Sequence, residues 1–313
     1  MHINPHSVYC SQLPTSLAPT GDVGAESFVT AAAEFAQQLP EHIRTAVAHF
    51  HAHSHESGAL LLRGLNVGAL PATPPTPTTS TSKDNTSERM LLAVAKLLGE
   101  PVGYKPELGG RLIQNLVPTQ ANQDKQVSTS SKVSLMFHTE AAFHPHRPTY
   151  LILLCLKGDA QAFTTLASIR EVLPLLSPEV RATLFEPRFR TAVDESYLNG
   201  RANVYGELRP VLSGDADAPT MVFDEDLMVG VDDEAQAALS LLARAVEAHH
   251  TSVCLQTGDM LIIDNAVAVH GRSPYTPRFD GTDRWLQRTF VVDNLDDSAS
   301  DRDGRVIMTV FGA

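Results

Sequence analysis

His138 and Glu140 are the residues whose types and spacing point most directly to chemistry. They lie in Phe137-His138-Thr139-Glu140, after a run (132–137) with the composition of a β-strand. Side chains alternate between the two faces of a strand, so His138 and Glu140 are predicted to point to the same side. An imidazole beside a carboxylate supplies two ligands of the two-histidine, one-carboxylate site of non-haem Fe(II) oxygenases. The pair therefore predicts a metal site, provided that a second histidine joins it.

His270 is the candidate for that second histidine. It follows the apolar run 260–263, and we expect an exposed imidazole at the far end of that strand, at the mouth of a barrel. Further along, Arg284 and Arg288 are predicted to share one face of a strand with Leu286. Buried arginines need anionic partners, and guanidinium groups bind carboxylates in a bidentate manner. These residues together predict a metal beside two carboxylates, one from a keto-acid cosubstrate and one from a substrate.

The elements that must position these residues follow from the hydrophobic pattern. Residues 1–23 are predicted to be irregular, and a helical region covers about 25–55 with a break at Pro40. A Pro/Thr-rich loop covers about 71–88, and a helix follows at 90–98. Short strands separated by Gly, Pro and Asp then dominate, with helices at 168–185 and 233–250. The pattern predicts a mainly β core, as a sandwich or barrel, with helices packed outside.

The bulk properties narrow the classes of partner. The chain has 313 residues and a formal net charge of -12, which argues against nucleic acid and anionic membrane surfaces. Its three cysteines are widely spaced, so we expect no disulfide framework, and Cys155 is interpreted as a buried hydrophobe. No signal peptide or membrane span is recognised, which makes the cytoplasm the expected location. The alternating histidines 49, 51, 53 and 55 are interpreted as solvated and scattered around a helix.

Several stretches resemble the clavaminate synthase-like Fe(II)/2-oxoglutarate dioxygenases. The similarity covers roughly residues 55–295, and the glutamate in the iron-binding motif, where aspartate is commoner, is specific to this subgroup. The matching stretches are 137–140, 155–159, 164–168, 258–270, 277–281 and 283–288. The resemblance implies a single dioxygenase domain (1–313) with a double-stranded β-helix, or jelly-roll, core at about 100–295. A Gly-, Asp- and Pro-rich loop at about 213–232 is the expected lid.

The resemblance also implies ligands for the cofactors. His138, Glu140 and His270 would bind Fe(II), and O2 would be the oxidant. Arg284, together with the hydroxyl of Thr164, would hold the distal carboxylate of 2-oxoglutarate.

The resemblance further implies residues that contact the substrate. Arg288 would meet the substrate's carboxylate, and Asp224 would hold its amine. Asp226 is a second candidate for the amine, although Asp224–Asp226 can also be read as a solvated acidic turn. Ser128 and Phe143 match positions that line the substrate pocket, and Gln114 is a further candidate for substrate contact.

The predicted function is hydroxylation of an unactivated C–H, at C3 or a nearby carbon, of a free amino acid or a small molecule derived from one. A carboxylate clamp and an amine-holding acid favour a zwitterion, and a second acid suits a basic side chain. Desaturation or ring closure, or a cyclic dipeptide or another natural-product intermediate as substrate, stays open because the same iron chemistry serves each. A jelly-roll binding protein without catalysis and a zinc hydrolase are the alternatives from other classes. The oligomeric state is left open.

Overall fold

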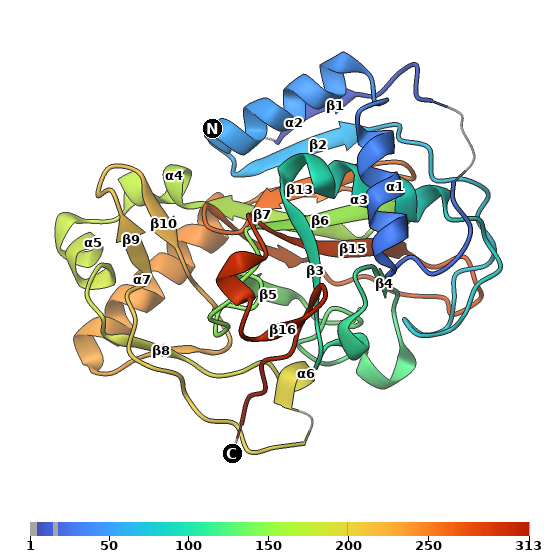
Figure 1. Ribbon diagram of the computed structural model, residues 1–313. Helices are drawn as coiled ribbons and strands as arrows, with labels where there is room; N and C mark the ends of the chain where they lie inside the picture. Colours follow the sequence, from blue (N-terminus) through green and yellow to red (C-terminus); the bar gives the residue numbers. More distant parts are fainter. Residues whose placement is uncertain (1–4, 15–17, 199, 313) are drawn as a thin grey trace.

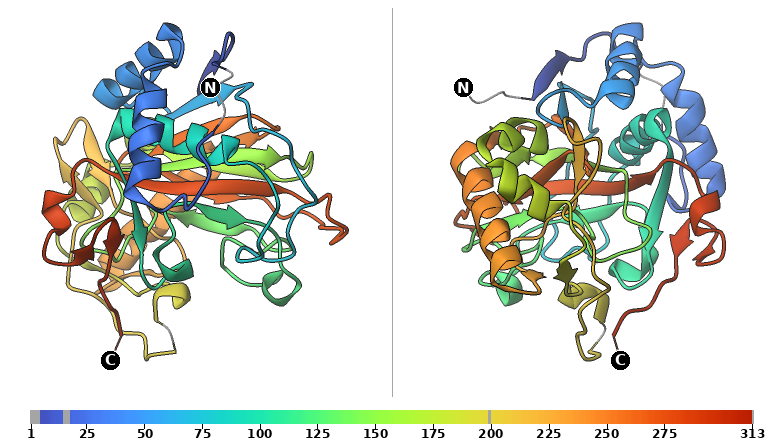
Figure 2. Two further views of the ribbon diagram at one scale, coloured as in Figure 1. Left: turned by 45° about the vertical axis from the view of Figure 1, so that its right-hand side comes forward. Right: turned by 90° about the vertical axis from the view of Figure 1, so that its left-hand side faces the viewer.

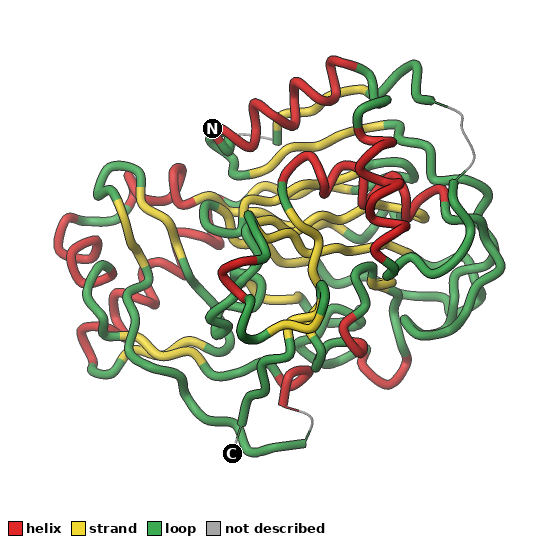
Figure 3. Tube along the Cα trace, in the orientation of Figure 1, coloured by secondary structure: helices red, strands yellow, loops and turns green. Residues whose placement is uncertain are grey.

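Two β-sheets pack against each other at the centre of the protein, and helices cover their outer faces (Figure 1, Figure 3). This computed structural model describes residues 5–14, 18–198 and 200–312. An apolar core that includes Leu61, Leu151, Leu166 and Val253 joins the inner faces of the two sheets. The predicted mainly β core with outer helices is therefore confirmed.

The larger sheet carries the two arginines of interest. In spatial order it contains β1 (His6–Tyr9), β2 (Ala59–Arg63), β13 (Met260–Asp264), β6 (Tyr150–Lys157), β15 (Trp285–Val292), β3 (Glu100–Tyr104), β17 (Val306–Ile307) and β16 (Arg302–Asp303), with β4 (Gln114–Leu116) also paired to β15. Strand alternation divides its side chains: Met260 and Ile262 face the helices, whereas Leu261 and Ile263 face the smaller sheet. Each such side chain, when fully buried, contributes about 1.5–3 kcal/mol to stability.

The smaller sheet carries the two histidines. Its order is β12 (Thr251–Cys254), β7 (Phe163–Ser168), β14 (Ala268–Arg272) and β5 (Leu135–His138). All of its pairings are antiparallel, and His270 on β14 lies opposite His138 on β5. The next residue, Gly271, has no room for a side chain: a Cβ there would lie 2.5 Å from the carbonyl oxygen of Leu135. This close approach lets the two histidine-bearing strands pair.

The helices form two groups on opposite outer faces (Figure 2). Helices α1 (Glu26–Ala36), α2 (Glu41–His53) and α3 (Thr86–Leu98) cover the larger sheet, and α4 (Ile169–Val172), α5 (Pro178–Leu184) and α7 (Asp233–His249) cover the smaller one. The remaining elements are the short helix α6 (Glu195–Leu198), the strand pairs β8 (Phe189–Thr191) with β11 (Met228–Gly230) and β9 (Leu212–Gly214) with β10 (Pro219–Met221), and the 3-10 turns η1 (Leu108–Gly110), η2 (Gln120–Asn122), η3 (Leu173–Leu175) and η4 (Asp296–Ser298). None of the helices in the described part of the chain is long and apolar enough to cross a bilayer.

Three sequence predictions need correction. Residues 6–9 are not irregular, because β1 pairs in parallel with β2 at the edge of the larger sheet. The Pro/Thr-rich loop ends at residue 85, and α3 begins at Thr86, four residues before the predicted start. The alternating histidines 49, 51 and 53 are exposed, as predicted, but they are only partly scattered: α2 ends at His53, Ser54 is left-handed, and the rings of His49 and His55 stack 5.2 Å apart. The buried position of Cys155 is confirmed.

Candidate active site

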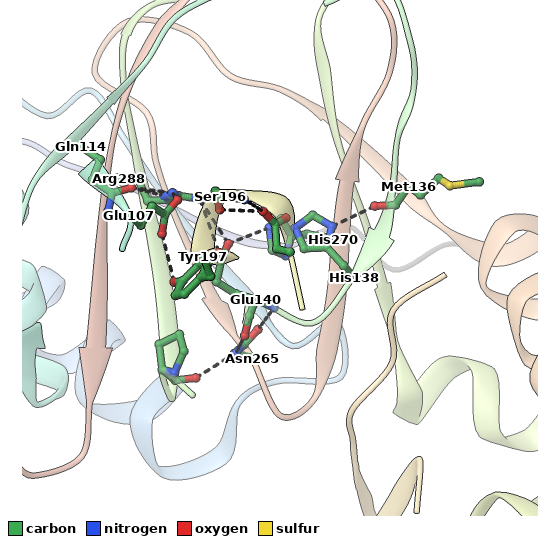
Figure 4. Close-up of polar contacts among 12 residues, drawn as sticks. Glu107, Gln114, Met136, His138, Glu140, Ser196, Tyr197, Asn265, His270 and Arg288 are labelled. Atoms are coloured by element: carbon green, nitrogen blue, oxygen red, sulfur yellow. Dashed lines mark hydrogen bonds and ion pairs between the residues drawn. The ribbon is translucent and has the colours of Figure 1, made fainter. Parts of the chain in front are cut away.

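Three potential metal ligands converge between the two sheets. Among the described residues, His138, Glu140 and His270 form the one group of three histidine, cysteine or acidic side chains whose ligand atoms all lie within 4.8 Å of one another. Nε2 of His270 lies 3.6 Å from Oε2 of Glu140, and the two imidazole centroids are 4.3 Å apart (Figure 4). Two imidazoles and one carboxylate at this spacing fit an Fe(II) ion with coordination positions to spare.

A turn, rather than a strand, positions Glu140. Strand β5 ends at His138, and the chain turns through Ala141, whose φ is 52°. The side chain of Asn265 fixes this turn, since it accepts a hydrogen bond from N of Glu140 (2.8 Å) and donates to the carbonyls of Glu140 (3.0 Å) and Pro148 (2.9 Å). The predicted convergence of His138 and Glu140 is therefore found, but strand alternation is the wrong reason for it.

Hydrogen bonding and burial orient the two imidazoles. The carbonyl oxygen of Met136 lies 2.9 Å from Nδ1 of His138; because a carbonyl can only accept, Nδ1 donates to it, and Nε2 is the nitrogen left for a metal. Burial, and next the nearby His138, hold the pKa of His270 well below its usual value. His270 is 6% exposed and lies within β14, so the prediction of an exposed histidine after the preceding apolar strand was wrong.

Arg288 lies beside the carboxylate ligand. Its guanidinium is 3.4 Å and 3.5 Å from the two carboxylate oxygens of Glu140, and it donates to Glu107 and to Oε1 of Gln114 (Figure 4). Burial, the largest influence, disfavours the cation, but the carboxylates of Glu107 and Glu140 outweigh it and raise the pKa of Arg288. Gln114 does not line the cavity and instead lies behind Arg288, holding its guanidinium.

Arg284 faces the same cavity from the residue before β15. It is 7% exposed, its Nη2 donates to Oγ1 of Thr164 (3.3 Å), and no carboxylate of a described residue forms an ion pair with it. The neighbouring Arg272 differs, because the carbonyls of Ser130, Val133 and Ser273 accept its protons. Arg284 is thus a buried cation aimed into a cavity without a counter-ion, which suits an incoming carboxylate.

The acidic turn, Asp224–Asp226, lies beside the metal ligand His138, because Asp224 forms an isolated antiparallel β-bridge with it. Asp224 is 8% exposed, and its Oδ1 accepts from the backbone N of Asp226 (3.0 Å) and of Leu227 (2.8 Å). Burial raises the pKa of Asp224 to about 6, and the nearby His138 opposes this shift. Asp226 is exposed but also lines the cavity. Asp224 is therefore a buried anchor of the turn rather than part of a solvated surface.

The cavity has a volume of about 140 Å³ and is lined by acidic residues as well as by its arginines. Ser128 and Phe143 line it, as the sequence predicted. Two further acids were missed by sequence reasoning, Glu107 and Asp194, each in a segment without regular structure. The residues predicted as lid, 213–232, hold the short strands β9, β10 and β11 together with the acidic turn.

Comparisons with known proteins give the class of this chain. The profile of the family described as taurine catabolism dioxygenase TauD, TfdA family matches residues 15–290. The L-lysine 3-hydroxylase of Catenulispora acidiphila is 38% identical over 92% of this chain and 82% of its own length. The L-asparagine oxygenase of Streptomyces coelicolor is also 38% identical, over 92% and 87%, and clavaminate synthase 2 of Streptomyces clavuligerus is 35% identical, over 90% and 87%.

Solved structures agree with this assignment. Asparagine oxygenase in complex with Fe(II), 2S,3S-3-hydroxyasparagine and succinate superposes with a TM-score of 0.90, at 35% identity, covering 98% of this chain and 99% of that one. The non-heme iron oxygenase OrfP in complex with Fe and alpha-ketoglutaric acid gives 0.82 at 32% identity, covering 92% of each. The chain belongs to the TauD/TfdA dioxygenase family. It is a non-haem iron dioxygenase that depends on 2-oxoglutarate, which confirms the predicted enzyme class and cofactors.

Proposed function

We propose that this enzyme hydroxylates C3 of a free amino acid with a basic side chain, of the lysine or arginine type. The observation that carries the proposal is the set of charges around the cavity. Three arginines, Arg272, Arg284 and Arg288, line it together with four acids that are not metal ligands, Glu107, Asp194, Asp224 and Asp226. Glu107 pairs with Arg288, whereas the other three acids form no ion pair with an arginine of the cavity. An amino acid with a second positive charge complements this arrangement at both ends.

The proposed roles start from the metal ligands. His138, Glu140 and His270 hold Fe(II), which, when bound, supplies the chemistry by which O2 and 2-oxoglutarate convert a C–H into a C–OH with release of succinate and CO2. Arg284 and the hydroxyl of Thr164 take the distal carboxylate of 2-oxoglutarate. A buried, unpaired guanidinium and an adjacent hydroxyl suit this task because a carboxylate accepts from both.

Arg288 sets the position of the substrate. We propose that it takes the α-carboxylate, with Glu107 as the partner of the α-amine. Because its guanidinium is within 3.5 Å of Glu140, a carboxylate held there keeps the α- and β-carbons near the metal ligands. The side chain then extends towards Asp224 and Asp226, where its ammonium or guanidinium group gains a charged hydrogen bond.

The fold and the surrounding wall complete the proposal. The two packed sheets are proposed to be a double-stranded β-helix within a single domain spanning 1–313, and 213–232 to act as a lid. The relatives named above share the iron chemistry but differ in amino acid, so they do not by themselves select the substrate. The acidic wall favours a basic side chain over the neutral amide of asparagine.

The test compares lysine with norleucine, which matches its length but lacks the ammonium group. We expect a kcat/KM for lysine at least about tenfold above that for norleucine, the factor for one charged hydrogen bond. Asp226→Asn should reduce that ratio, whereas Asp217→Asn, an exposed acid outside the cavity, should not. A ratio that Asp226→Asn leaves unchanged would remove the assigned role of this acid.

A further inference from the structure

A second cavity lies beside the active site, behind the wall formed by Ala142 and Phe143. Its volume is about 130 Å³, and those two residues line both cavities. The rest of its wall comes from β8, β11 and the segment 206–213. None of the iron ligands or cavity acids described above belongs to it, so it is a separate compartment with its own chemistry.

Two arginines face this second cavity, Arg147 and Arg209. The guanidinium of Arg147 donates to the carbonyls of Ala142 (3.3 Å) and His144 (3.2 Å). Within the described residues, no carboxylate forms an ion pair with either arginine, although Glu207 lines the same cavity. Burial, and next the charge of Arg209, lower the pKa of Arg147. The two cations therefore repel each other without a counter-ion.

The remainder of the wall is largely apolar. Phe189 and Met228 come from the paired strands β8 and β11, and Val222 and Phe143 lie beside them. The half-buried guanidinium of Arg147 has no anionic partner among the described residues, and an apolar wall favours an anion with a hydrocarbon part. We propose that this cavity is a binding site for a small aliphatic carboxylate, whose charged end lies between Arg147 and Arg209.

The occupied site would connect two segments that are far apart in the chain. Arg147 lies on the loop that follows the metal ligand Glu140, and Arg209 is the last residue of an exposed stretch, 201–209. A carboxylate between the arginines would hold this stretch against the loop and would reduce its exposure to proteases. This inference depends on the second cavity alone and does not rest on the proposed substrate.

The test titrates butyrate into the full-length protein, loaded anaerobically with Fe(II) and saturating 2-oxoglutarate so that Arg284 is engaged. Loss of binding in Arg209→Gln assigns the butyrate to the second cavity rather than to Arg288. Isothermal titration calorimetry at constant ionic strength should give one saturable site. Arg209→Gln should weaken butyrate binding at least about tenfold, as expected for loss of one charged hydrogen bond. Arg147→Gln should do the same. Arg209→Gln is the preferred variant, because the Arg147 guanidinium also donates to two backbone carbonyls, whereas the Arg209 guanidinium donates to none among the described residues.

Arg190→Gln is the matched control, because Arg190 is an exposed arginine on β8 that does not line the cavity. It should bind butyrate as the wild type does. Butyrate should also slow chymotryptic cleavage at Tyr205, which is 53% exposed, in the wild type but not in Arg209→Gln. Equal affinity in wild type and Arg209→Gln would overturn the site. Sulfate binding as tightly as butyrate would overturn the assignment to an aliphatic carboxylate.

Discussion

Replacing Arg284 by glutamine should weaken the binding of 2-oxoglutarate without destabilising the protein. Arg284 is 7% exposed, and its contact with Thr164 spans 3.3 Å. Charge-assisted hydrogen bonds contribute about 1.5–3 kcal/mol each. Loss of a two-point contact to a carboxylate should therefore cost about 3–6 kcal/mol, which is roughly a 100- to 20,000-fold rise in dissociation constant. The cosubstrate-free variant should be as stable as the wild type, because a buried cation without a counter-ion contributes little stability.

The assay is titration calorimetry of 2-oxoglutarate into anaerobic, Fe(II)-loaded protein, with melting temperatures of the cosubstrate-free forms measured in parallel. Arg284→Lys is the control, since it keeps the positive charge but loses the planar guanidinium group. Its affinity for 2-oxoglutarate should fall between those of the wild type and Arg284→Gln. In steady-state kinetics, Arg284→Gln should raise the KM for 2-oxoglutarate far more than the KM for the substrate. An unchanged dissociation constant, or equal effects on both KM values, would refute the assigned role.

Three further predictions concern the metal site and its surroundings. His138→Ala should abolish turnover and Fe(II) binding while leaving the circular dichroism spectrum unchanged; full activity would mean that the iron site is misplaced. Asn265→Ala should lower the free energy of unfolding in urea by about 3 kcal/mol, because the Glu140 turn loses buried hydrogen bonds, and should weaken Fe(II) binding; an unchanged midpoint would contradict this. Burial lowers the pKa of His144 to about 3, so the unfolded state takes up the proton first and stability present above about pH 6.5 is lost on acidification. His144→Phe should therefore reduce the dependence of stability on pH below 6.5 by up to about 1.4 kcal/mol per pH unit, and identical slopes would show that His144 does not titrate in this way.

The sequence predicted those parts of the site that carry their own chemical signature. His138, Glu140 and His270 combine metal-ligating side chains, and Arg284 and Arg288 repeat at strand spacing. The route to these positions was harder to predict, because Glu140 is placed by a turn that Asn265 fixes from 125 residues away. Such a contact leaves no local pattern.

The missed residues share a physical reason. Glu107 and Asp194 lie in irregular segments without a recognisable motif, and only the tertiary fold brings them to the cavity. Strand β1 is four residues long with an exposed or half-buried pattern, so pairing with β2 decides its conformation more than local propensity does. Likewise His55 reaches His49 because α2 ends at the left-handed Ser54, which helical periodicity does not predict.

The central claim is that this chain is a 2-oxoglutarate-dependent hydroxylase of a free basic amino acid. The most direct measurement incubates the enzyme with Fe(II), 2-oxoglutarate and each free amino acid in turn, and follows product mass and succinate together. We predict that lysine or arginine gains one oxygen atom, with succinate formed in equal amount and the hydroxyl located on C3. No oxygenated product from any basic amino acid, with efficient hydroxylation of a neutral one, would contradict the account.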